Sequence, residues 1–321
     1  MSTFTRNLWF TSPMMRGGDV VDVQGQLYTK GFQLKTDGLF GRETANAVSD
    51  FQRKNRLSVD GVVGHMTWAE LFDVPSVQPD RFAEDILTEA QISALMQKHR
   101  YFGGSAGRAQ WALEKNGLVV DDAAGPVYAP SDQEAVGQVM EKFASIIYAV
   151  LTKVQVPIEL VVACICVESS GNPNAIRREP GCSFVDPELT PAKVSVGLMQ
   201  TLLSTARDAL QRQDIHIADL RDPALSIEAG ATYMWRQGRL TGFDPPVVGA
   251  AYNAGSLRFD SSPQNRWRMV QYPIGTSQYD DRFVGFFNAA MDGANSLFDK
   301  IADPLVKQRI PSLRKLMPIA R

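Results

Sequence analysis

The residue whose type and position best suit catalysis is Glu168, which follows the largely apolar run Ile158–Val167. Pro157 precedes the run and Gly171-Asn-Pro173 follows it, which favours a helix over the buried strand that the β-branched residues would also permit. At the C-terminal end of a buried helix, the helix dipole and the lack of solvent both disfavour a carboxylate anion, so the pKa of Glu168 should be raised. A glutamate protonated near neutral pH can protonate a leaving glycosidic oxygen and then act as a base.

Position alone leaves an alternative open, in which the Glu168 side chain is exposed or pairs with Arg177 or Arg178. The surrounding motifs favour catalysis. They occur in the order Glu168-Ser169-x-Gly171-Asn172-Pro173-Asn174-Ala175, Gly197-Leu198-Met199-Gln200 and Ala250-Ala251-Tyr252-Asn253-Ala254-Gly255, with further matches at Thr205-Ala206, Asp222-Pro223, Ile227, Gly230 and Tyr233. Through these motifs, residues from roughly 135 to 290 resemble the lysozyme-like family of soluble lytic transglycosylases.

The resemblance implies that Glu168 is the acid and base. It also implies a cleft for the sugar beside the scissile bond, lined by Ser169, Met199, Gln200, Tyr252 and Asn253. The family often has a Tyr-Val pair near the end of the domain, whereas this chain has Tyr279-Asp-Asp-Arg-Phe283-Val284, so the assisting tyrosine is either Tyr279 or absent. Each of these residues also has a purely structural interpretation. Met199 could belong to the core, Gln200 and Asn253 could hold loops together by hydrogen bonds, and Tyr252 could be a packed aromatic ring.

Two reactions are compatible with this pattern. Most glycosidases use two carboxylates. The resemblance implies that one suffices, because the C6 hydroxyl of MurNAc attacks C1 and forms a 1,6-anhydro ring, an intramolecular step that gains from proximity. The alternative is a goose-type muramidase, which hydrolyses the same MurNAc-GlcNAc β-1,4 bond and has an aspartate where this chain has Leu202. Glu179, Asp186 and Glu188 are the possible substitutes, although a charged loop is more often a solvated surface.

The N-terminal region contains an internal repeat. Asp-Gly-x-x-Gly-x-x-Thr occurs at Asp37–Thr44 and again at Asp60–Thr67, and each copy reads as a turn that leads into a helix with its threonine as the N-cap. The chain here resembles the three-helix peptidoglycan-binding domain. The likeness rests on Gly18, Asp19, Val20, Val23, Gln24, Leu27, Gly31, Phe32, Asp37, Gly38, Phe40, Gly41, Thr44, Ala47, Val48, Phe51, Gln52, Leu57, Asp60, Gly61, Gly64, Thr67, Trp68 and Leu71.

These signals predict a mainly α fold, in which a small three-helix domain is followed by an α-helical lysozyme-like domain. We expect residues 1–72 to form the peptidoglycan-binding domain and residues 73–130 a linker and helical bridging region, with helices near Phe82–Tyr101 and Ala109–Asn116. Residues 131–298 should form the catalytic domain, which begins with a Ser131–Glu134 capping box. Residues 299–321 should form a basic C-terminal tail.

Composition limits the other functions. With 321 residues, 44% hydrophobic, 21% charged and a net charge of -2, the chain is typical of a globular protein with more than one core, and no nucleic-acid partner is expected. Cys164, Cys166 and Cys182 suggest buried free thiols. The three histidines lack metal-ligand spacing, so we expect no metal and no cofactor. The expected partner is bacterial peptidoglycan, bound by a monomer.

The ends of the chain bear on where it acts. No signal peptide or membrane span is expected, because the N-terminus lacks a long apolar run and no later run reaches about 18 residues. The basic tail leaves a weak contact with an anionic membrane open, beside the alternative of a solvated terminal helix. The layout resembles modular endolysins of phages of Gram-negative hosts, which implies release from the host cytoplasm to act on the periplasmic wall for host cell lysis. A virion-associated lysin and an injected antibacterial effector are alternatives.

Overall fold

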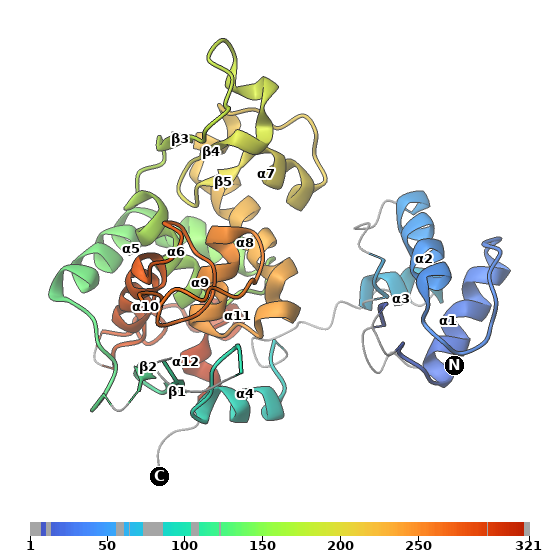
Figure 1. The fold of residues 1–321 in the computed structure, drawn as a ribbon, viewed down its shortest axis with the longest axis horizontal. Helices are drawn as coiled ribbons and strands as arrows, with labels where there is room; N and C mark the ends of the chain where they lie inside the picture. Colours follow the sequence, from blue (N-terminus) through green and yellow to red (C-terminus); the bar gives the residue numbers. More distant parts are fainter. Residues whose placement is uncertain are drawn as a thin grey trace. The chain divides into compact units, whose positions relative to one another are not determined.

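The computed structural model describes residues 8–10, 14–55, 61–63, 65–72, 86–103, 109–121, 123–293 and 295–317. The chain divides into two compact units, Met1–Asp80 and Arg81–Arg321 (Figure 1). Both units are mainly helical, which confirms the predicted fold class. Within the described residues, no helix is both long and apolar enough to cross a membrane.

The smaller unit has three helices, α1 (Gly18–Thr29), α2 (Arg42–Lys54) and α3 (His65–Leu71), as predicted. One face of each helix contributes to a single apolar core, because their apolar residues recur at helical spacing. The buried core residues are Leu8, Val20, Val23, Leu27, Phe40, Ala47, Val48, Phe51, Val63, Trp68 and Leu71. Leu57, Asp60 and Gly64 of the predicted motif lie outside the described residues.

A buried glutamine supports the turn of each repeat. The Gln24 side-chain amide donates to Thr44 Oγ1 at 3.0 Å, and its oxygen accepts from the Gly38 N–H at 2.8 Å. In the second repeat, the Gln52 side-chain amide donates to Thr67 Oγ1 at 3.1 Å, and its oxygen accepts from the Gly61 N–H at 2.9 Å. The predicted N-cap role of the two threonines is therefore wrong: α2 and α3 begin two residues earlier, and the hydroxyls face the glutamines instead.

The larger unit is built around α6 (Ile158–Ser169), whose residues 158–167 are all buried, as the helical interpretation requires. Helix α6 packs against α5 (Pro130–Leu151), α9 (Pro245–Ala254) and α10 (Gln278–Met291), while α8 (Pro223–Thr241) packs on α5 and α9. The predicted capping box at Ser131 is wrong. Helix α5 starts at Pro130, a favoured first position for proline, and Asp132 Oδ2 accepts from the Ala129 N–H at 2.8 Å.

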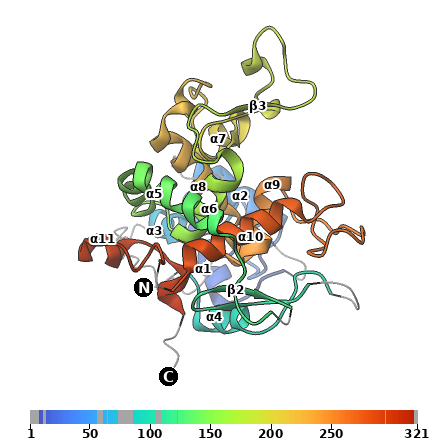
Figure 2. The same ribbon diagram turned by 90° about the vertical axis from the view of Figure 1, so that its left-hand side faces the viewer.

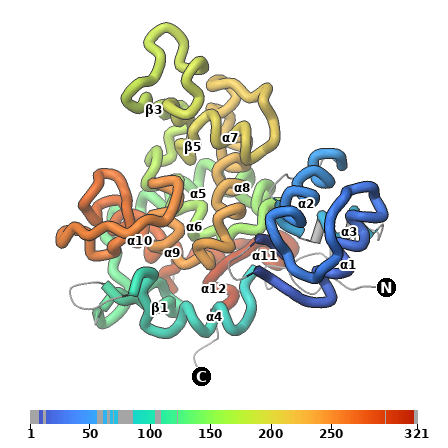
Figure 3. The backbone as a smooth tube through the Cα atoms, turned by 45° about the vertical axis from the view of Figure 1, so that its right-hand side comes forward, coloured from blue at the N-terminus to red at the C-terminus, as the bar shows by residue number. Residues whose placement is uncertain are grey.

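A small lobe follows α6. It contains the antiparallel strands β3 (Ile176–Arg178), β4 (Val194–Val196) and β5 (Thr201–Leu202), in the order β3-β4-β5, with Ile176 opposite Val196 and Val196 opposite Thr201. Helix α7 (Leu203–Leu210) and three short 3-10 turns, Pro187–Leu189, Pro191–Lys193 and Asp219–Arg221, complete it. Figures 2 and 3 show this lobe at one end of the helices, with the loop between α9 and α10 projecting below it. The lobe has its own apolar core, made of Cys182, Val194, Val196, Leu203, Ala206, Ile215, Leu220 and Ala229.

The structure differs from the predicted bridging region. Helix α4 covers only Glu89–Met96, and the helix predicted over Ala109–Asn116 is wrong, because β1 (Trp111–Glu114) and β2 (Gly117–Val120) form an antiparallel hairpin. Trp111, Leu113 and Leu118 of this hairpin belong to the main core of the larger unit. This tertiary burial favours a strand, since alternate residues of β1 face the core. The predicted linker at Val74–Pro79 lies outside the described residues.

The predicted basic tail is also part of the larger unit. Helices α11 (Pro304–Arg309) and α12 (Leu313–Leu316) lie in it, and Ile310, Leu313 and Met317 are buried in the main core. Apolar residues interleaved with the basic ones explain this, because their burial removes apolar surface from water. The C-terminal segment therefore completes the unit that contains α6.

Candidate active site

Glu168 lies in the last turn of α6, where the helices meet the small lobe. The helix ends there because Ser170 and Gly171 adopt left-handed conformations, with φ of 53° and 74°. The Glu168 side chain is half-buried, and its Oε1 accepts a hydrogen bond from the Tyr279 hydroxyl at 2.6 Å. Tyr279 is buried in the first turn of α10. Two residues 111 positions apart thus form the polar centre of the site.

Burial raises the pKa of Glu168 to about 7, in the direction predicted from its position. The Tyr279 hydrogen bond and the positive charges of Arg177 and Arg282 lower it and so partly offset burial. Arg177 does not take Glu168 as its salt-bridge partner, since its Nε bonds Glu179 Oε1 at 2.8 Å. At neutral pH the carboxyl is therefore divided between its acid and base forms, as proton transfer in both directions requires.

The Gly197–Gln200 segment lies against the end of α6. Ser169 Oγ donates to the Leu198 carbonyl at 2.7 Å, which joins the two motifs. Gly197 has a φ of 81°, and a Cβ at this position would lie 2.1 Å from the Leu220 carbonyl oxygen, so only glycine fits. Gln200, half-buried, donates from Nε2 to the carbonyls of Ala175 at 3.0 Å and Gly197 at 2.9 Å.

Met199 and Tyr252 pack beneath this segment. The Tyr252 hydroxyl donates to the Met199 carbonyl at 2.9 Å and lies 3.1 Å from Thr201 Oγ1. The two side chains meet α8 at Gly230, where a Cβ would lie 2.6 Å from Met199 Sδ and 2.8 Å from the Tyr252 hydroxyl. Met199 is fully buried and Tyr252 nearly so. Both side chains are therefore packed in the main core of the larger unit.

Asn253, the next residue of α9, holds the loop that leads to α10. Its Oδ1 accepts from the Tyr272 N–H at 2.6 Å. Asn253 is half-buried, whereas the Tyr272 side chain is 45% exposed. The loop therefore presents an aromatic side chain to solvent next to a motif residue.

Hydrogen bonds connect most of the predicted residues. Tyr279 bonds Glu168, Ser169 reaches the backbone beside Met199, and Tyr252 bonds Met199 itself. Gln200 and Asn253 form hydrogen bonds with loop backbone, and Met199 lies in the core, as the structural interpretations of these residues predicted. Sequence reasoning missed Arg282 as a charge that acts on Glu168; its position three residues after Tyr279 on one helix was the available signal.

Sequence reasoning also missed a buried carboxylate that positions α9. Asp244, the residue before this helix, accepts from Trp111 Nε1 at 2.8 Å and bonds His99 Nε2 at 3.0 Å. Both partners come from the segment that was predicted to be a bridge. A sequence pattern could not reveal the contact, because Asp244 is 133 and 145 residues away from its partners.

Two cysteines lie on the same helix as Glu168, and the charge of Glu168 acts on Cys164. Burial raises the pKa of the Cys166 thiol to about 12 and that of Cys164 well above its usual value, so both are poor nucleophiles. Among the described residues, no group of three or more His, Cys, Asp or Glu side chains is arranged to hold a metal ion.

Comparisons with known proteins match both units. Residues 145–268 match the family model of the transglycosylase SLT domain, and residues 16–71 match that of a putative peptidoglycan binding domain. A crystal structure of a Burkholderia AP3 phage endolysin matches 88% of this chain and 98% of its own, with 16% identity and a TM-score of 0.26. A TM-score this low does not establish a shared overall structure.

Proposed function

We propose that Glu168 performs both proton transfers of the reaction. The chain is a peptidoglycan-degrading lytic transglycosylase, in which a putative peptidoglycan-binding domain precedes a transglycosylase SLT domain. The observation that carries the proposal is the half-buried Glu168 carboxyl, with a pKa of about 7 and a 2.6 Å hydrogen bond from Tyr279. Such a group can donate a proton and recover one within a single turnover.

The reaction begins when protonated Glu168 gives its proton to the oxygen of the MurNAc-GlcNAc β-1,4 bond as the C1–O bond breaks. The C6 hydroxyl of the same MurNAc then attacks C1 and passes its proton to the Glu168 carboxylate. A C1–O6 bond has formed, the acid form of Glu168 has been restored and no water has been consumed. The attack is intramolecular, so the enzyme needs only to hold the sugar in a reactive geometry.

Tyr279 is the assisting tyrosine in this proposal. Burial and the nearby charge of Glu168 raise its pKa well above the usual value, so it stays a hydrogen-bond donor. By holding Oε1, it leaves Oε2 to face the substrate. Ser169, Met199, Gln200, Tyr252 and Asn253 are proposed to shape the sugar site from beneath and from its edges.

Formation of the anhydro ring is favoured over hydrolysis because the possible second carboxylates have other partners. Glu179 pairs with Arg177 at 2.8 Å, and Asp186 Oδ1 accepts from the Glu188 N–H at 2.9 Å. Glu188 itself bonds His216 Nδ1 at 2.6 Å, in the small lobe. The charges that act on Glu168 are those of Arg177 and Arg282. Each of these three carboxylates is therefore engaged by groups other than Glu168.

We further propose that the chain is an endolysin that acts as a monomer, since the acid, its tyrosine and the site residues come from one chain. Residues 1–72 would bind the wall, and the larger unit would cut it. This role implies accumulation in the host cytoplasm and action on the periplasmic wall, with a virion-associated lysin or an injected effector as the alternatives. A membrane contact of the C-terminal segment would rest on exposed Lys300 and Arg309, because Arg314 is buried.

The test replaces Glu168 by glutamine, which keeps the shape but cannot transfer the proton. Glu168→Gln should reduce release of fragments from purified peptidoglycan by at least about a thousandfold, while the protein still sediments with the wall. Glu141→Gln, on the exposed face of α5, is the matched control and should keep full activity. Appreciable turnover by Glu168→Gln would refute the assignment.

Mass spectrometry of the released muropeptides tests the product. Anhydro ends lack one water relative to reducing ends, so the wild-type protein should release fragments that are lighter by this difference. Reducing ends alone would establish hydrolysis.

A further inference from the structure

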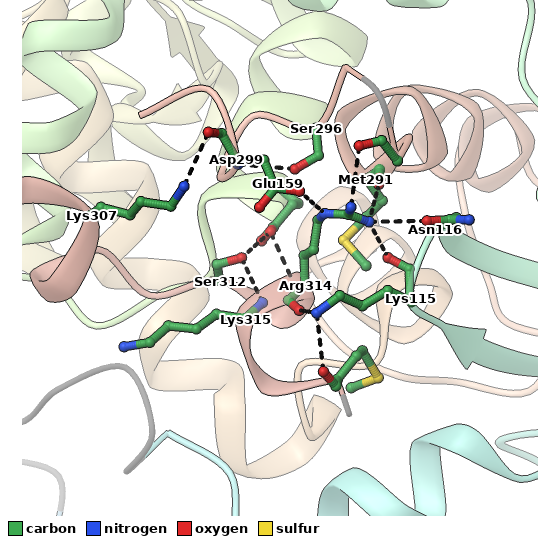
Figure 4. Close-up of polar contacts among 12 residues, drawn as sticks. Lys115, Asn116, Glu159, Met291, Ser296, Asp299, Lys307, Ser312, Arg314 and Lys315 are labelled. Atoms are coloured by element: carbon green, nitrogen blue, oxygen red, sulfur yellow. Dashed lines mark hydrogen bonds and ion pairs between the residues drawn. The ribbon is translucent and has the colours of Figure 1, made fainter. Parts of the chain in front are cut away.

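A second polar cluster, buried except for Asp299, lies at the opposite end of α6 from Glu168 (Figure 4). It joins the first turn of this helix to the C-terminal segment, and its central residues are Glu159, Asp299, Ser312 and Arg314. We call these four residues the C-terminal clamp. Asp299, Ser312 and Arg314 lie outside residues 145–268, which match the SLT domain.

Glu159 is fully buried in the first turn of α6. It accepts hydrogen bonds from the Ser312 hydroxyl, from the Leu313 N–H at 3.1 Å and from the Arg314 N–H at 3.4 Å. Burial raises the pKa of Glu159, and these three donors oppose the rise. A buried carboxyl with three donors from one short segment ties that segment to the start of α6.

Arg314 connects the same segment to α10. Its guanidinium is buried and donates to Asp299 Oδ2 at 2.6 Å, to the Met291 carbonyl at 3.2 Å and to the Gly293 carbonyl at 3.2 Å. It also donates to the Lys115 carbonyl at 2.7 Å, in the turn of the β1–β2 hairpin. Only arginine offers donors in several directions from one rigid plane.

The clamp thus lies at one end of α6 and α10, and Glu168 and Tyr279 lie at the opposite end of the same two helices. Along α6, the distance from Glu159 to Glu168 is about 14 Å at the rise per residue of an α-helix. Helix α10 begins beside Tyr279 and ends at Met291, whose carbonyl Arg314 holds. The two helices pack directly on each other. A shift of one helix along the other at the clamp would therefore change the separation of Glu168 and Tyr279 at the opposite end.

We propose that Arg314 and Ser312 are positioning residues for catalysis, which hold α6 and α10 in the register that forms the Tyr279–Glu168 hydrogen bond. This proposal rests on the proposed role of Glu168. In this proposal the C-terminal segment contributes to catalysis by positioning two helices, whereas its charge had predicted only a basic tail.

A readout that separates positioning from folding is the pH dependence of turnover. The groups that face Glu168 are Tyr279 and Arg282 from α10, Arg177 from β3, Tyr252 from α9 and Cys164 from α6 itself. Tyr279 is the one that donates a hydrogen bond to Glu168, and this bond lowers the Glu168 pKa. A looser register weakens that bond, so the limb on which activity falls with rising pH should move to higher pH.

The experiment measures kcat and KM of Arg314→Ala, Arg314→Lys and Ser312→Ala on soluble peptidoglycan fragments from pH 5 to 9. Circular dichroism at the assay temperature gives the folded fraction. For the folded fraction of Arg314→Ala, kcat should fall about tenfold or more, while KM should stay within about threefold of the wild-type value. The basic limb of the pH profile should move to higher pH by at least about half a pH unit. Arg314→Lys should show a smaller change, because lysine keeps one of the contacts.

Gln308→Ala is the control, since Gln308 is an exposed residue of the same segment outside the clamp. It should leave kcat and the pH profile unchanged. The proposal is overturned if the folded fraction of Arg314→Ala keeps the wild-type kcat and basic limb. If that variant does not fold, Arg314→Lys and Ser312→Ala decide by the same criterion. A failure of the Glu168 assignment would appear separately, as turnover by Glu168→Gln.

Discussion

A carboxyl group serves most efficiently as both acid and base near neutral pH when its pKa is close to 7. In Glu168, burial raises the pKa, while the Tyr279 hydroxyl and the charges of Arg177 and Arg282 keep it from rising further. The value of about 7 is thus the balance of one large effect against three smaller ones. Each of the smaller effects comes from an element other than α6.

Tyr279→Phe tests this balance, because it removes the hydrogen bond that lowers the Glu168 pKa. The basic limb of the kcat/KM profile should move up by about one pH unit, and kcat at pH 6 should fall about 10- to 100-fold as the carboxyl loses its orientation. The measurement is turnover of soluble fragments from pH 5 to 9. Tyr148→Phe, in α5 of the same unit, should change neither quantity. An unchanged basic limb in Tyr279→Phe would contradict the proposed interaction.

Helix α9 shows how an element depends on distant segments. It carries Tyr252 and Asn253 at its C-terminal end, while Asp244 before its first turn is held by Trp111 and His99. His99 Nδ1 also lies 2.8 Å from the Gln97 carbonyl, so both ring nitrogens face oxygen acceptors. Because both nitrogens then donate, this arrangement favours the charged imidazolium.

The stability of the larger unit should therefore depend on pH through His99. Burial alone would lower the pKa of His99, but the hydrogen bond and charge of Asp244 outweigh it and the pKa is raised. A folded-state pKa above the unfolded value of about 6.5 means that the contribution is fully present below that pH and is lost as the pH rises through the folded-state pKa.

The variant His99→Gln measures this contribution. It should lower the free energy of unfolding by about 1–2 kcal/mol at pH 5.5 and by clearly less at pH 8.5. Urea unfolding followed by tryptophan fluorescence provides the comparison. An equal loss of stability at the two pH values would show that the charge of His99 is not involved.

The molecule as a whole has two compact units, each with its own core, and the proposed function assigns wall binding to one and cutting to the other. Tethering a catalyst to a polymeric substrate raises its local concentration without any change in its active site. The two units should therefore contribute separately to wall degradation. This separation is a property that can be measured.

Deletion of residues 1–72 should reduce the fraction of protein that sediments with purified peptidoglycan, by about tenfold or more. Turnover of soluble fragments should stay within about twofold of the full chain, because the larger unit has its own core and contains Glu168 and Tyr279. Sedimentation assays and fragment turnover provide the two measurements. Unchanged sedimentation of the shortened protein would refute a wall-binding role for the N-terminal unit.

The sequence by itself determined the features that depend on local patterns. The three-helix unit, the helix that carries Glu168 in its last turn and the order of the three motifs could all be predicted, because helical periodicity, turn residues and motif spacing are local properties. The raised pKa of Glu168 followed from its place at the end of an apolar helix.

Only the tertiary structure decided the remainder. The partner of Glu168 is Tyr279, and the partners of Asp244 and Glu159 come from segments predicted to be a bridge and a tail. The helix predicted over Ala109–Asn116 is also wrong, because burial on the main core favours a hairpin there. A pKa and a helix register depend on groups that are far apart in the chain and meet only in the folded core.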